Sequence, residues 1–541
     1  MVSTDHRPPI TDHRLLPHRI LPVTPERYNA ATLIDSNLES GRGEKIAIYF
    51  ADERITYRQL FNRVCAMGRA LRELGVAREN RVILVLDDTP SFPVAFFGTM
   101  RIGAVPVPVN PSYKASDYRF FLEDSYARVV ITETSCLDKL KIALKDLDGT
   151  FTVIATNGAA PEEPDIYQLE DLLASHSGEL APVNTHRDDV AFWLYSSGST
   201  GSPKGVVHRH KDIPATCNTY ARHIMRLTER DIVFGRVLFH AYGLGNSLTF
   251  PFTSGASSIL VAGRPSPGAT LDLIKQFRPT VLCLVPTVYN AILNETNATE
   301  PTDLSSLRLC ISAAEPLAPH IWRRWKEKFG LIILDGIGST EMLHIFCSNT
   351  LEAYKPGSSG RPVPGYELRI LDDEERSVDP GNTGNLLVKG ESAAAYYWHQ
   401  DEKSRHTMRG EWTATGDRYR VDEEGFYWYE GRADDMLKVG GEWVSPIDIE
   451  NTLMEHASVQ EAAAVGVPVE GITRIRAVII LARGAIGGPE LAAELQMFCK
   501  YRLQLYEYPH IIDFVDELPK TATGKIQRFK LRMEWLERSN R

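Results

Sequence analysis

The segment Tyr195–Gly205, YSSGSTGSPKG, decides how the rest of the chain can be organised. It is too polar and too rich in glycine for a hydrophobic core, and it directly follows the strand-like apolar run VAFWLY. Its glycines allow a ligand to approach the backbone closely, its hydroxyls and amides offer hydrogen-bond donors, and Lys204 adds a positive charge. The pattern indicates a phosphate-binding loop at the end of a strand, with an ordinary surface turn as the alternative.

This segment is not a P-loop, because the Walker A pattern GxxxxGK[ST] has glycine before its lysine and a hydroxyl residue after it. Here Pro203 precedes Lys204 and Gly205 follows it. A second glycine-rich run, GIGSTE at residues 336–341, departs from the dinucleotide pattern GxGxxG because Glu341 replaces the third glycine. Glu341 is instead suited to hold magnesium, and a capped strand-to-helix turn is the alternative interpretation.

The composition is that of a globular protein with more than one domain. The chain has 541 residues, 43% of them hydrophobic and 24% charged, which is too long for a single core. A net charge of −10 disfavours nucleic acid and anionic membranes as partners, so small molecules are expected. No apolar run in the sequence reaches the length of a membrane span, and the seven cysteines lack zinc-type or disulfide spacing. We expect a cytoplasmic location.

Strand-like and helix-like patterns alternate from Lys45 onward. Apolar runs such as IAIYF and RVILVLDD predict strands, and YRQLFNRVCAMGRALRELG predicts a helix between them. This alternation favours largely parallel sheets covered on both faces. Residues 157–188 are polar and weakly patterned. Three later runs, at residues 281–286, 307–317 and 331–341, end in small or polar residues, so several strand ends can meet at one ligand site.

The pattern changes at both ends of the chain. Residues 1–25 contain DHR twice, several prolines and few large apolar residues, which predicts a flexible arm. Near residue 410, short alternating runs rich in Gly, Asp and aromatic residues are typical of hairpins and indicate a domain edge. A smaller α/β unit follows and leads to LPKTATGK at residues 518–525. This last segment is flexible and cationic, and a solvated basic terminus is its alternative interpretation.

Five motifs, taken in order along the chain, resemble one family. They are YSSGSTGSPKG (195–205), GIGSTE (336–341), TGD (415–417), GRADD (431–435) and PKTATGK (519–525). Together they resemble the adenylate-forming superfamily of acyl-CoA ligases, which includes acyl-CoA synthetases, peptide-synthetase adenylation domains and luciferase. HAYGLGNS, GIGSTEMLHIF and LKVGGEWVSP look most like its benzoate-CoA ligase branch. The resemblance covers nearly the whole chain from about residue 25.

The resemblance implies a fold and a reaction. The fold is α/β, with a large N-terminal domain of two α/β sheets plus a small β-barrel (residues 26–433). A small mobile C-terminal α/β domain (residues 434–541) follows, with a hinge at Asp434. The reaction is ATP- and Mg²⁺-dependent activation of a carboxylic acid to an acyl-AMP with loss of pyrophosphate, and then transfer of the acyl group to coenzyme A with loss of AMP.

The resemblance also gives each motif a role. Lys525 would bridge the substrate carboxylate and the α-phosphate, Glu341 would bind magnesium, and Thr340 would support the α-phosphate. The residues that would bind ATP are Ser196, Ser197, Gly198, Ser199, Thr200, Gly201, Lys204, Ala314, Glu315, Asp335, Gly336, Asp417, Arg432 and Lys525. The residues that would line the acid pocket are His240, Ala241, Tyr242, Gly338, His344 and Ile345. This set is too apolar and too tight for a long fatty chain, and a single planar ring fits it best.

Several alternatives stay open from the sequence. The acyl group could pass to the phosphopantetheine arm of a carrier protein, and the acid could be alicyclic or a substituted benzoate. A nonenzymatic nucleotide sensor on the same scaffold is disfavoured because Lys204, Glu341 and Lys525 are all retained. A homodimer and a lysine acetyltransferase that acts on Lys525 are further candidate partners.

Overall fold

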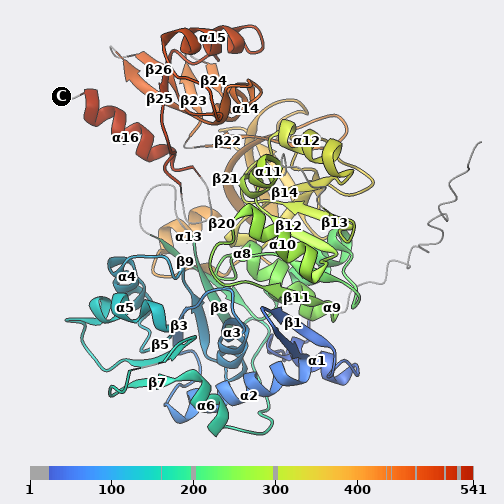
Figure 1. Cartoon of the computed structure of the whole chain (residues 1–541), viewed down its shortest axis with the longest axis vertical. Coiled ribbons are helices and arrows are strands. Elements are labelled where there is room, and N and C mark those ends of the chain that lie inside the picture. Colours follow the sequence, from blue (N-terminus) through green and yellow to red (C-terminus); the bar gives the residue numbers. More distant parts are fainter. Residues whose placement is uncertain are drawn as a thin grey trace, which may run out of the picture.

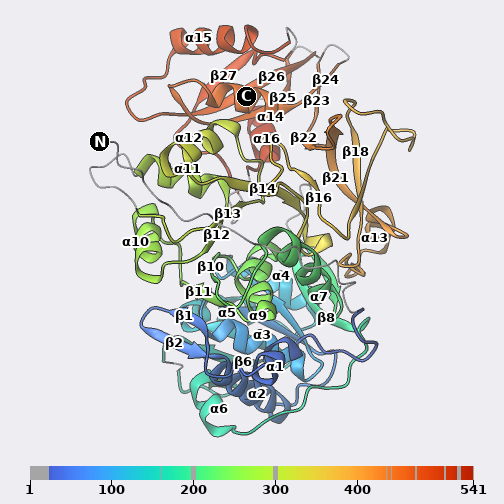
Figure 2. The same cartoon turned by 90° about the vertical axis from the view of Figure 1, so that its right-hand side faces the viewer.

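A computed structural model describes residues 23–159, 161–196, 203–295, 303–433, 435–439, 442–469, 472–504, 507–520 and 526–539. Two views show a large N-terminal part and a smaller C-terminal domain at one end of it (Figures 1 and 2). The fold is α/β, as the sequence predicts. Most of the predicted flexible arm, residues 1–22, lies outside the described residues.

The first sheet of the N-terminal part is parallel throughout its described strands, in the order β4-β3-β5-β6-β7. Its strands are β3 (Arg81–Val85), β4 (Val105–Pro108), β5 (Val129–Glu133), β6 (Thr152–Thr156) and β7 (Ile166–Gln168). The helices of this region are α2 (Tyr57–Glu73), α3 (Ser91–Arg101), α4 (Ala115–Ser125), α5 (Leu137–Leu144) and α6 (Leu169–Ser175). Both β7 and α6 fall in the weakly patterned stretch 157–188, for which no helix or strand was predicted.

The second sheet has nine strands, in the order β16-β15-β14-β13-β12-β10-β11-β1-β2. Its strands are β1 (Ile46–Phe50), β2 (Glu53–Thr56), β10 (Ile232–Phe234), β11 (Ser257–Leu260), β12 (Val281–Leu284), β13 (Leu309–Ser312), β14 (Ile333–Gly338), β15 (Ile345–Ser348) and β16 (Arg361–Pro362). The central strands are parallel, and β2, β15 and β16 join the two edges in antiparallel pairing. All four residues of β12, VLCL, are buried, which explains why the sequence there is continuously apolar.

Helices cover both faces of each sheet, as the alternation predicts. Side chains alternate along β3, so that Val82 packs in the core shared with α2 and α3 while Ile83 packs in the core shared with α4 and α5. The first of these cores extends to the second sheet, whose other face packs against α10 (Pro267–Phe277), α11 (Pro286–Glu295) and α12 (Pro319–Phe329). Further helices of the N-terminal part are α1 (Thr32–Glu39), α7 (Asp212–Thr216), α8 (Ala241–Leu244) and α9 (Phe250–Ser254).

Two antiparallel sheets complete the N-terminal part. The larger takes the place expected for the small β-barrel and contains β17 (Glu367–Leu371), β18 (Gly384–Lys389), β20 (Met408–Arg409), β21 (Trp412–Val421) and β22 (Tyr427–Arg432). The smaller pairs β8 (Val190–Ser196) with β9 (Lys204–Arg209) and β9 with β19 (Tyr396–Tyr397), and α13 (Asp401–Thr407) follows it. A strand therefore does deliver the glycine- and serine-rich segment, but it belongs to a hairpin rather than to a parallel sheet.

The C-terminal domain is a small α/β unit with its own core. Its elements are β23 (Leu437–Val439), β24 (Glu442–Val444), α14 (Pro446–Met454), β25 (Val459–Val469), β26 (Ile472–Leu481), α15 (Pro489–Lys500), β27 (Ile511–Phe514) and α16 (Arg528–Ser539). A buried ion pair joins two of its helices, with Arg528 Nη2 2.6 Å from Glu450 Oε2. Removing one partner would leave a buried charge unpaired, so this contact fixes the start of α16 against α14.

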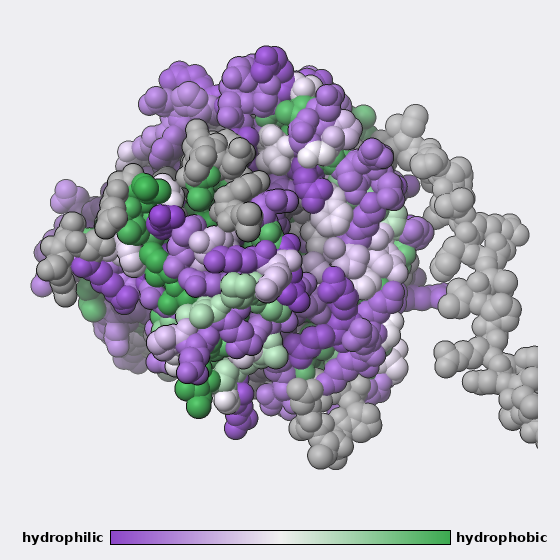
Figure 3. All heavy atoms as spheres, turned by 90° about the horizontal axis from the view of Figure 1, so that it is seen from above, coloured by the Kyte–Doolittle hydropathy of each residue, from purple (hydrophilic) through white to green (hydrophobic). Residues whose placement is uncertain are grey.

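The surface of the C-terminal end is mainly hydrophilic. Seen from this end, polar residues cover most of the described surface and hydrophobic residues form only a few patches (Figure 3). Within the described ranges, no helix is both long enough and apolar enough to cross a membrane.

Candidate active site

A cavity of about 520 Å³ lies between the N-terminal part and the C-terminal domain. Every predicted site residue that the structure describes lines it. These are Ser196, Lys204, His240, Ala241, Tyr242, Ala314, Glu315, Asp335, Gly336, Gly338, Thr340, Glu341, His344, Ile345, Asp417 and Arg432. Their roles remain predictions, but residues far apart in the sequence do meet at one place.

Seven predicted residues lie outside the described part of the chain. They are Ser197, Gly198, Ser199, Thr200, Gly201, Asp434 and Lys525. Described residues near two of these segments do line the cavity. Ser196 and Lys204 flank residues 197–201, and Ile526 follows Lys525.

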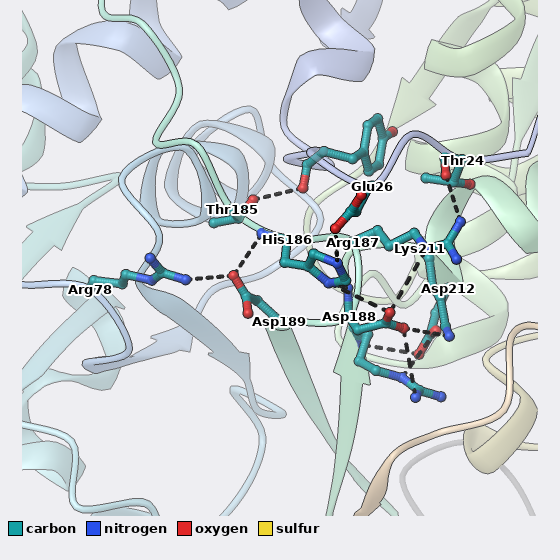
Figure 4. A network of polar contacts seen from close by, with 12 residues as sticks. Thr24, Glu26, Arg78, Thr185, His186, Arg187, Asp188, Asp189, Lys211 and Asp212 are labelled. Carbon is teal, nitrogen blue, oxygen red and sulfur yellow. Dashed lines mark hydrogen bonds and ion pairs between the residues drawn. The ribbon is translucent and has the colours of Figure 1, made fainter.

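The hairpin β8–β9 is anchored at the end opposite Ser196 and Lys204. Just before β8, Asp188 forms an ion pair with Lys211, and Asp189 accepts a hydrogen bond from the His186 N–H at 2.7 Å (Figure 4). Arg209, the last residue of β9, lies 3.8 Å from Asp212. This polar network fixes the base of the hairpin, so the strands carry Ser196 and Lys204 to the cavity from a rigid support.

Tyr397 is a cavity residue that the sequence analysis missed. Its hydroxyl donates a hydrogen bond to Oε1 of Glu341 at 2.7 Å, and burial together with that carboxylate raises the pKa of the phenol. The Lys204 ammonium lies 5.0 Å from the centroid of the Tyr397 ring. The backbone of β19 pairs with β9, which places Tyr397 between the lysine and the carboxylate. The only signal in the sequence is the AAAYYWH run, which has no distinctive spacing.

His208 connects the two glycine-rich motifs through the protein interior. It lies on β9, is fully buried, and its Nε2 is 2.8 Å from the carbonyl oxygen of Thr340. Its Nδ1 is 2.9 Å from Asp212, the residue that begins α7. Asp212 and Thr340 contact opposite ring nitrogens, which holds the imidazole in one orientation. The hairpin thus supports the backbone of the segment that carries Thr340 and Glu341.

An ion pair organises the predicted ribose end of the cavity. Nη1 of Arg432 lies 3.1 Å from Asp417 and donates to the carbonyl oxygen of Thr415 at 2.8 Å. These residues face each other on β21 and β22, where Asp417 and Arg432 are cross-strand partners. The carboxylate is therefore held at a fixed position in the cavity wall, where it can accept hydrogen bonds from vicinal hydroxyls.

Asp335 is buried at the predicted adenine end. Burial raises the pKa of its carboxyl to about 8, and the Leu317 N–H opposes this shift. At neutral pH the group is therefore mostly protonated and can donate as well as accept a hydrogen bond, which suits a purine ring. Ile337, two residues further along β14, adds an apolar contact surface to the same wall.

The predicted acid pocket has aromatic walls. His344 is buried, and its ring centroid lies 4.9 Å from that of Tyr220, 5.8 Å from that of Tyr242 and 4.5 Å from that of Phe250. Burial lowers the pKa of His344 to about 3, so the imidazole is neutral. Tyr242 places its hydroxyl near the carbonyl oxygens of Leu284 and Ile311. A neutral, aromatic lining of this kind favours an apolar planar substituent on the acid.

Contacts on either side of residue 434 tie the chain to different domains. Before it, Arg432 pairs with Asp417 and the Ala433 N–H donates to Gly416 O at 3.0 Å, within the N-terminal part. After it, Asp435 accepts a hydrogen bond from Arg532 of α16 at 2.8 Å. The C-terminal domain also closes the cavity, with Lys520 and Gln527 among its lining residues.

A magnesium ion that arrives with ATP fits the residues present. The described residues contain no group of three or more His, Cys, Asp or Glu arranged to hold a metal. Magnesium commonly binds one or two carboxylates together with substrate phosphates and water, rather than a complete protein cage. The Glu341 carboxylate, which accepts a hydrogen bond from Tyr397 at the cavity wall, would supply one such ligand.

Comparisons with known proteins agree with the motifs. The model of the AMP-binding enzyme family matches residues 37–398, and that of the AMP-binding enzyme C-terminal domain matches residues 448–525. The chain is 44% identical to benzoate–CoA ligase of Thauera aromatica, over 97% of this chain and 99% of that protein. It is 43% identical to 4-hydroxybenzoate–CoA/benzoate–CoA ligase of Rhodopseudomonas palustris, over 93% of this chain and 94% of that protein.

Solved structures are similar as well. The anthranilate CoA ligase AuaEII in complex with anthranoyl-AMP has a TM-score of 0.91 and 41% identity, and the match covers 96% of this chain and 99% of that one. A benzoate CoA ligase from Burkholderia xenovorans LB400 has a TM-score of 0.86 and 43% identity, with 93% and 100% covered. The resemblance to the adenylate-forming superfamily is confirmed, and the chain belongs to the AMP-binding enzyme family.

Proposed function

We propose that this enzyme is an AMP-forming acid–thiol ligase that converts an aromatic carboxylic acid, benzoate or a close analogue, to its coenzyme A thioester. The observation that carries the proposal is one cavity that joins the phosphate-binding motifs to an aromatic pocket, in a chain 44% identical to a benzoate–CoA ligase. In the first half-reaction a carboxylate oxygen attacks the α-phosphorus of ATP, and pyrophosphate leaves. In the second, the coenzyme A sulfur attacks the acyl carbon, and AMP leaves.

The first half-reaction needs positive charge, because a carboxylate must approach an equally negative triphosphate. Lys204 lies at the cavity wall and is assigned to the β- and γ-phosphates, while Lys525 is assigned to the space between the carboxylate and the α-phosphate. Glu341 holds the magnesium ion, which neutralises phosphate charge when bound. Asp417 and Arg432 would orient the ribose, and Asp335 would orient the adenine.

The second half-reaction motivates a domain movement. Adenylation needs Lys525 beside the α-phosphate, and coenzyme A must then approach the acyl group at the same site. We therefore assign residues 26–433 to a nucleotide- and acid-binding domain and residues 434–541 to a mobile domain that carries Lys525. Asp434 is the proposed hinge, because its neighbours on the two sides are bound to different domains.

Asp434→Pro should separate the two half-reactions. Proline fixes φ near −65° and also restricts Ala433, so the chain should be confined to one domain orientation. With adenylation as the resting geometry, pyrophosphate release in a single turnover should stay within about threefold of wild type, while thioester formation from benzoyl-AMP should fall at least about tenfold. Rapid-quench assays of each half-reaction measure both. Wild-type thioester formation in Asp434→Pro would rule out a hinge at this residue.

Aromatic acids should be used far better than acetate. Burial of a phenyl ring contributes on the order of 3 kcal/mol, so kcat/KM for benzoate should exceed that for acetate by about a hundredfold. A panel of benzoate, 4-hydroxybenzoate, cyclohexanecarboxylate and acetate, assayed for coenzyme A-dependent AMP formation, tests this and separates aromatic from alicyclic acids. 4-Hydroxybenzoate should lag unless a pocket histidine receives its hydroxyl, because an unpaired buried hydroxyl costs about 1–3 kcal/mol. Comparable values for acetate and benzoate would contradict the proposal.

The same assay distinguishes acyl transfer to a carrier protein from transfer to free coenzyme A. A carrier-loading enzyme would release pyrophosphate with benzoate but form no benzoyl-CoA.

We also extend the proposal to a cytoplasmic location, and we retain a homodimer and a lysine acetyltransferase acting on Lys525 as candidate features. Acetylation would remove the positive charge of Lys525 and so should block the first half-reaction.

A further inference from the structure

A nearly buried carboxylate behind the acid pocket does not line the cavity. Asp88 follows β3 of the first sheet and is only 3% exposed. Its Oδ2 accepts a hydrogen bond from the Val237 N–H at 2.6 Å, and its Oδ1 accepts one from the Leu238 N–H at 2.7 Å. One side chain of the first sheet therefore holds two consecutive amides of the segment that runs from β10 to α8.

The segment that Asp88 holds contains a backbone conformation that its residue disfavours. Val237 has φ of +70°, in the left-handed region that β-branched residues rarely adopt. Such a conformation persists only where the surroundings impose it. Here Asp88 accepts hydrogen bonds from the N–H of Val237 itself and from that of the next residue. Burial raises the pKa of Asp88 to about 6 and these two N–H groups oppose that shift, so the side chain is a carboxylate that can accept both bonds at neutral pH.

This segment forms the start of the acid pocket. The carbonyl oxygen of Val237 accepts a hydrogen bond from the His240 N–H at 3.0 Å, which closes a turn, and Phe239 and His240 within that turn line the cavity. The next helix packs directly on it, since a Cβ at Gly243 would lie 2.1 Å from the Arg236 carbonyl oxygen and 2.2 Å from that of Val237. The orientation of Val237 therefore determines the position of α8, which carries Tyr242.

We propose that Asp88 is a positioning residue that sets the affinity for the aromatic acid by holding Val237 in its left-handed conformation. The inference rests on the proposed function and adds a residue that no cavity contact would identify. The proposal predicts a selective effect, because Asp88 supports the wall formed by residues 239–242. The described residues with predicted phosphate and ribose contacts lie elsewhere, on β8, β9, β21 and β22 and just after β14.

The test is Asp88→Asn, in which one acceptor oxygen becomes an amide donor. The KM for benzoate in ATP–pyrophosphate exchange should rise about tenfold, which corresponds to about 1.4 kcal/mol, while the KM for ATP should stay within about twofold. Val237→Gly should then rescue the variant, since glycine adopts positive φ without steric cost. The double variant should return the benzoate KM to within about threefold of Val237→Gly alone.

A role in stability alone would give a different result. Loss of folded enzyme lowers the amount of active protein without changing the KM for benzoate, and glycine at position 237 would not restore it. If Asp88→Asn does not fold, the test instead compares the KM for benzoate of the double variant with that of Val237→Gly alone. A benzoate KM in Asp88→Asn within twofold of wild type, a failed rescue by glycine, or failure of both Asp88 variants to fold would each overturn the proposal. A wild-type enzyme inactive on every aromatic acid would instead contradict the proposed function.

Discussion

Glu341→Gln should slow acyl-AMP formation by several hundredfold. The substitution keeps the size of the side chain but replaces an anionic magnesium ligand with a weak neutral one, so charge on the departing pyrophosphate is less well neutralised. Loss of one group that stabilises developing charge typically costs about 10²–10³ in rate. Single-turnover pyrophosphate release from benzoate and ATP measures the effect. The magnesium concentration for half-maximal rate should also rise, which a purely structural defect would not produce.

Tyr397→Phe is the matched control for this prediction. It removes only the hydrogen bond to Glu341 and leaves the carboxylate, so the cost should be about 1 kcal/mol, or roughly fivefold in rate. The magnesium dependence should shift in the same direction by a smaller amount. A Glu341→Gln enzyme that stays within tenfold of wild type at saturating magnesium would contradict the assignment of Glu341 as the metal ligand.

The cavity illustrates which residues a sequence can reveal. Ser196, Lys204 and Glu341 belong to contiguous motifs whose residue types suit phosphate or metal, and the family resemblance assigns Asp417 to the ribose, so all four could be predicted before their positions in space were known. The strand alternation also predicted that such motifs would meet, because the ends of parallel strands lie at one edge of a sheet. The rule holds for Glu341, which follows β14 in the parallel part of the second sheet, but Lys204 and Asp417 reach the same cavity from antiparallel sheets.

Residues that act through other residues could not be predicted in this way. Tyr397 reaches Glu341 only because β19 pairs with β9, and such a pairing between residues nearly 200 positions apart has no local pattern. Asp88 is one of two adjacent aspartates after β3, and nothing in the sequence says which of them is buried or that it holds Val237. The antiparallel hairpin β8–β9 was likewise hidden, because a buried apolar run looks the same in parallel and antiparallel sheets.

Lys525→Ala should reduce acyl-AMP formation by about a thousandfold and leave the second half-reaction largely intact. The positive charge is needed while negative charge builds between the carboxylate and the α-phosphate, and the proposed domain movement would carry Lys525 away before coenzyme A attacks the acyl-AMP. Thioester formation from supplied benzoyl-AMP should therefore stay within about threefold of wild type. Rapid-quench measurement of pyrophosphate from benzoate and ATP, and of benzoyl-CoA from benzoyl-AMP, gives both rates.

Lys520→Ala supplies a control with the same change of charge at a described residue that lines the cavity. Lys520 lines the cavity five residues before Lys525, but its ammonium is already paired with Glu461 at 2.5 Å. If net positive charge in the cavity were sufficient for adenylation, the two variants would lose similar activity. If instead the charge must lie between the reacting groups, Lys520→Ala should lose less than about tenfold, because its paired ammonium is not available to them. Equal losses in the two variants, or equal losses of both half-reactions in Lys525→Ala, would therefore contradict the specific role of Lys525 and point to a general electrostatic effect of the C-terminal domain.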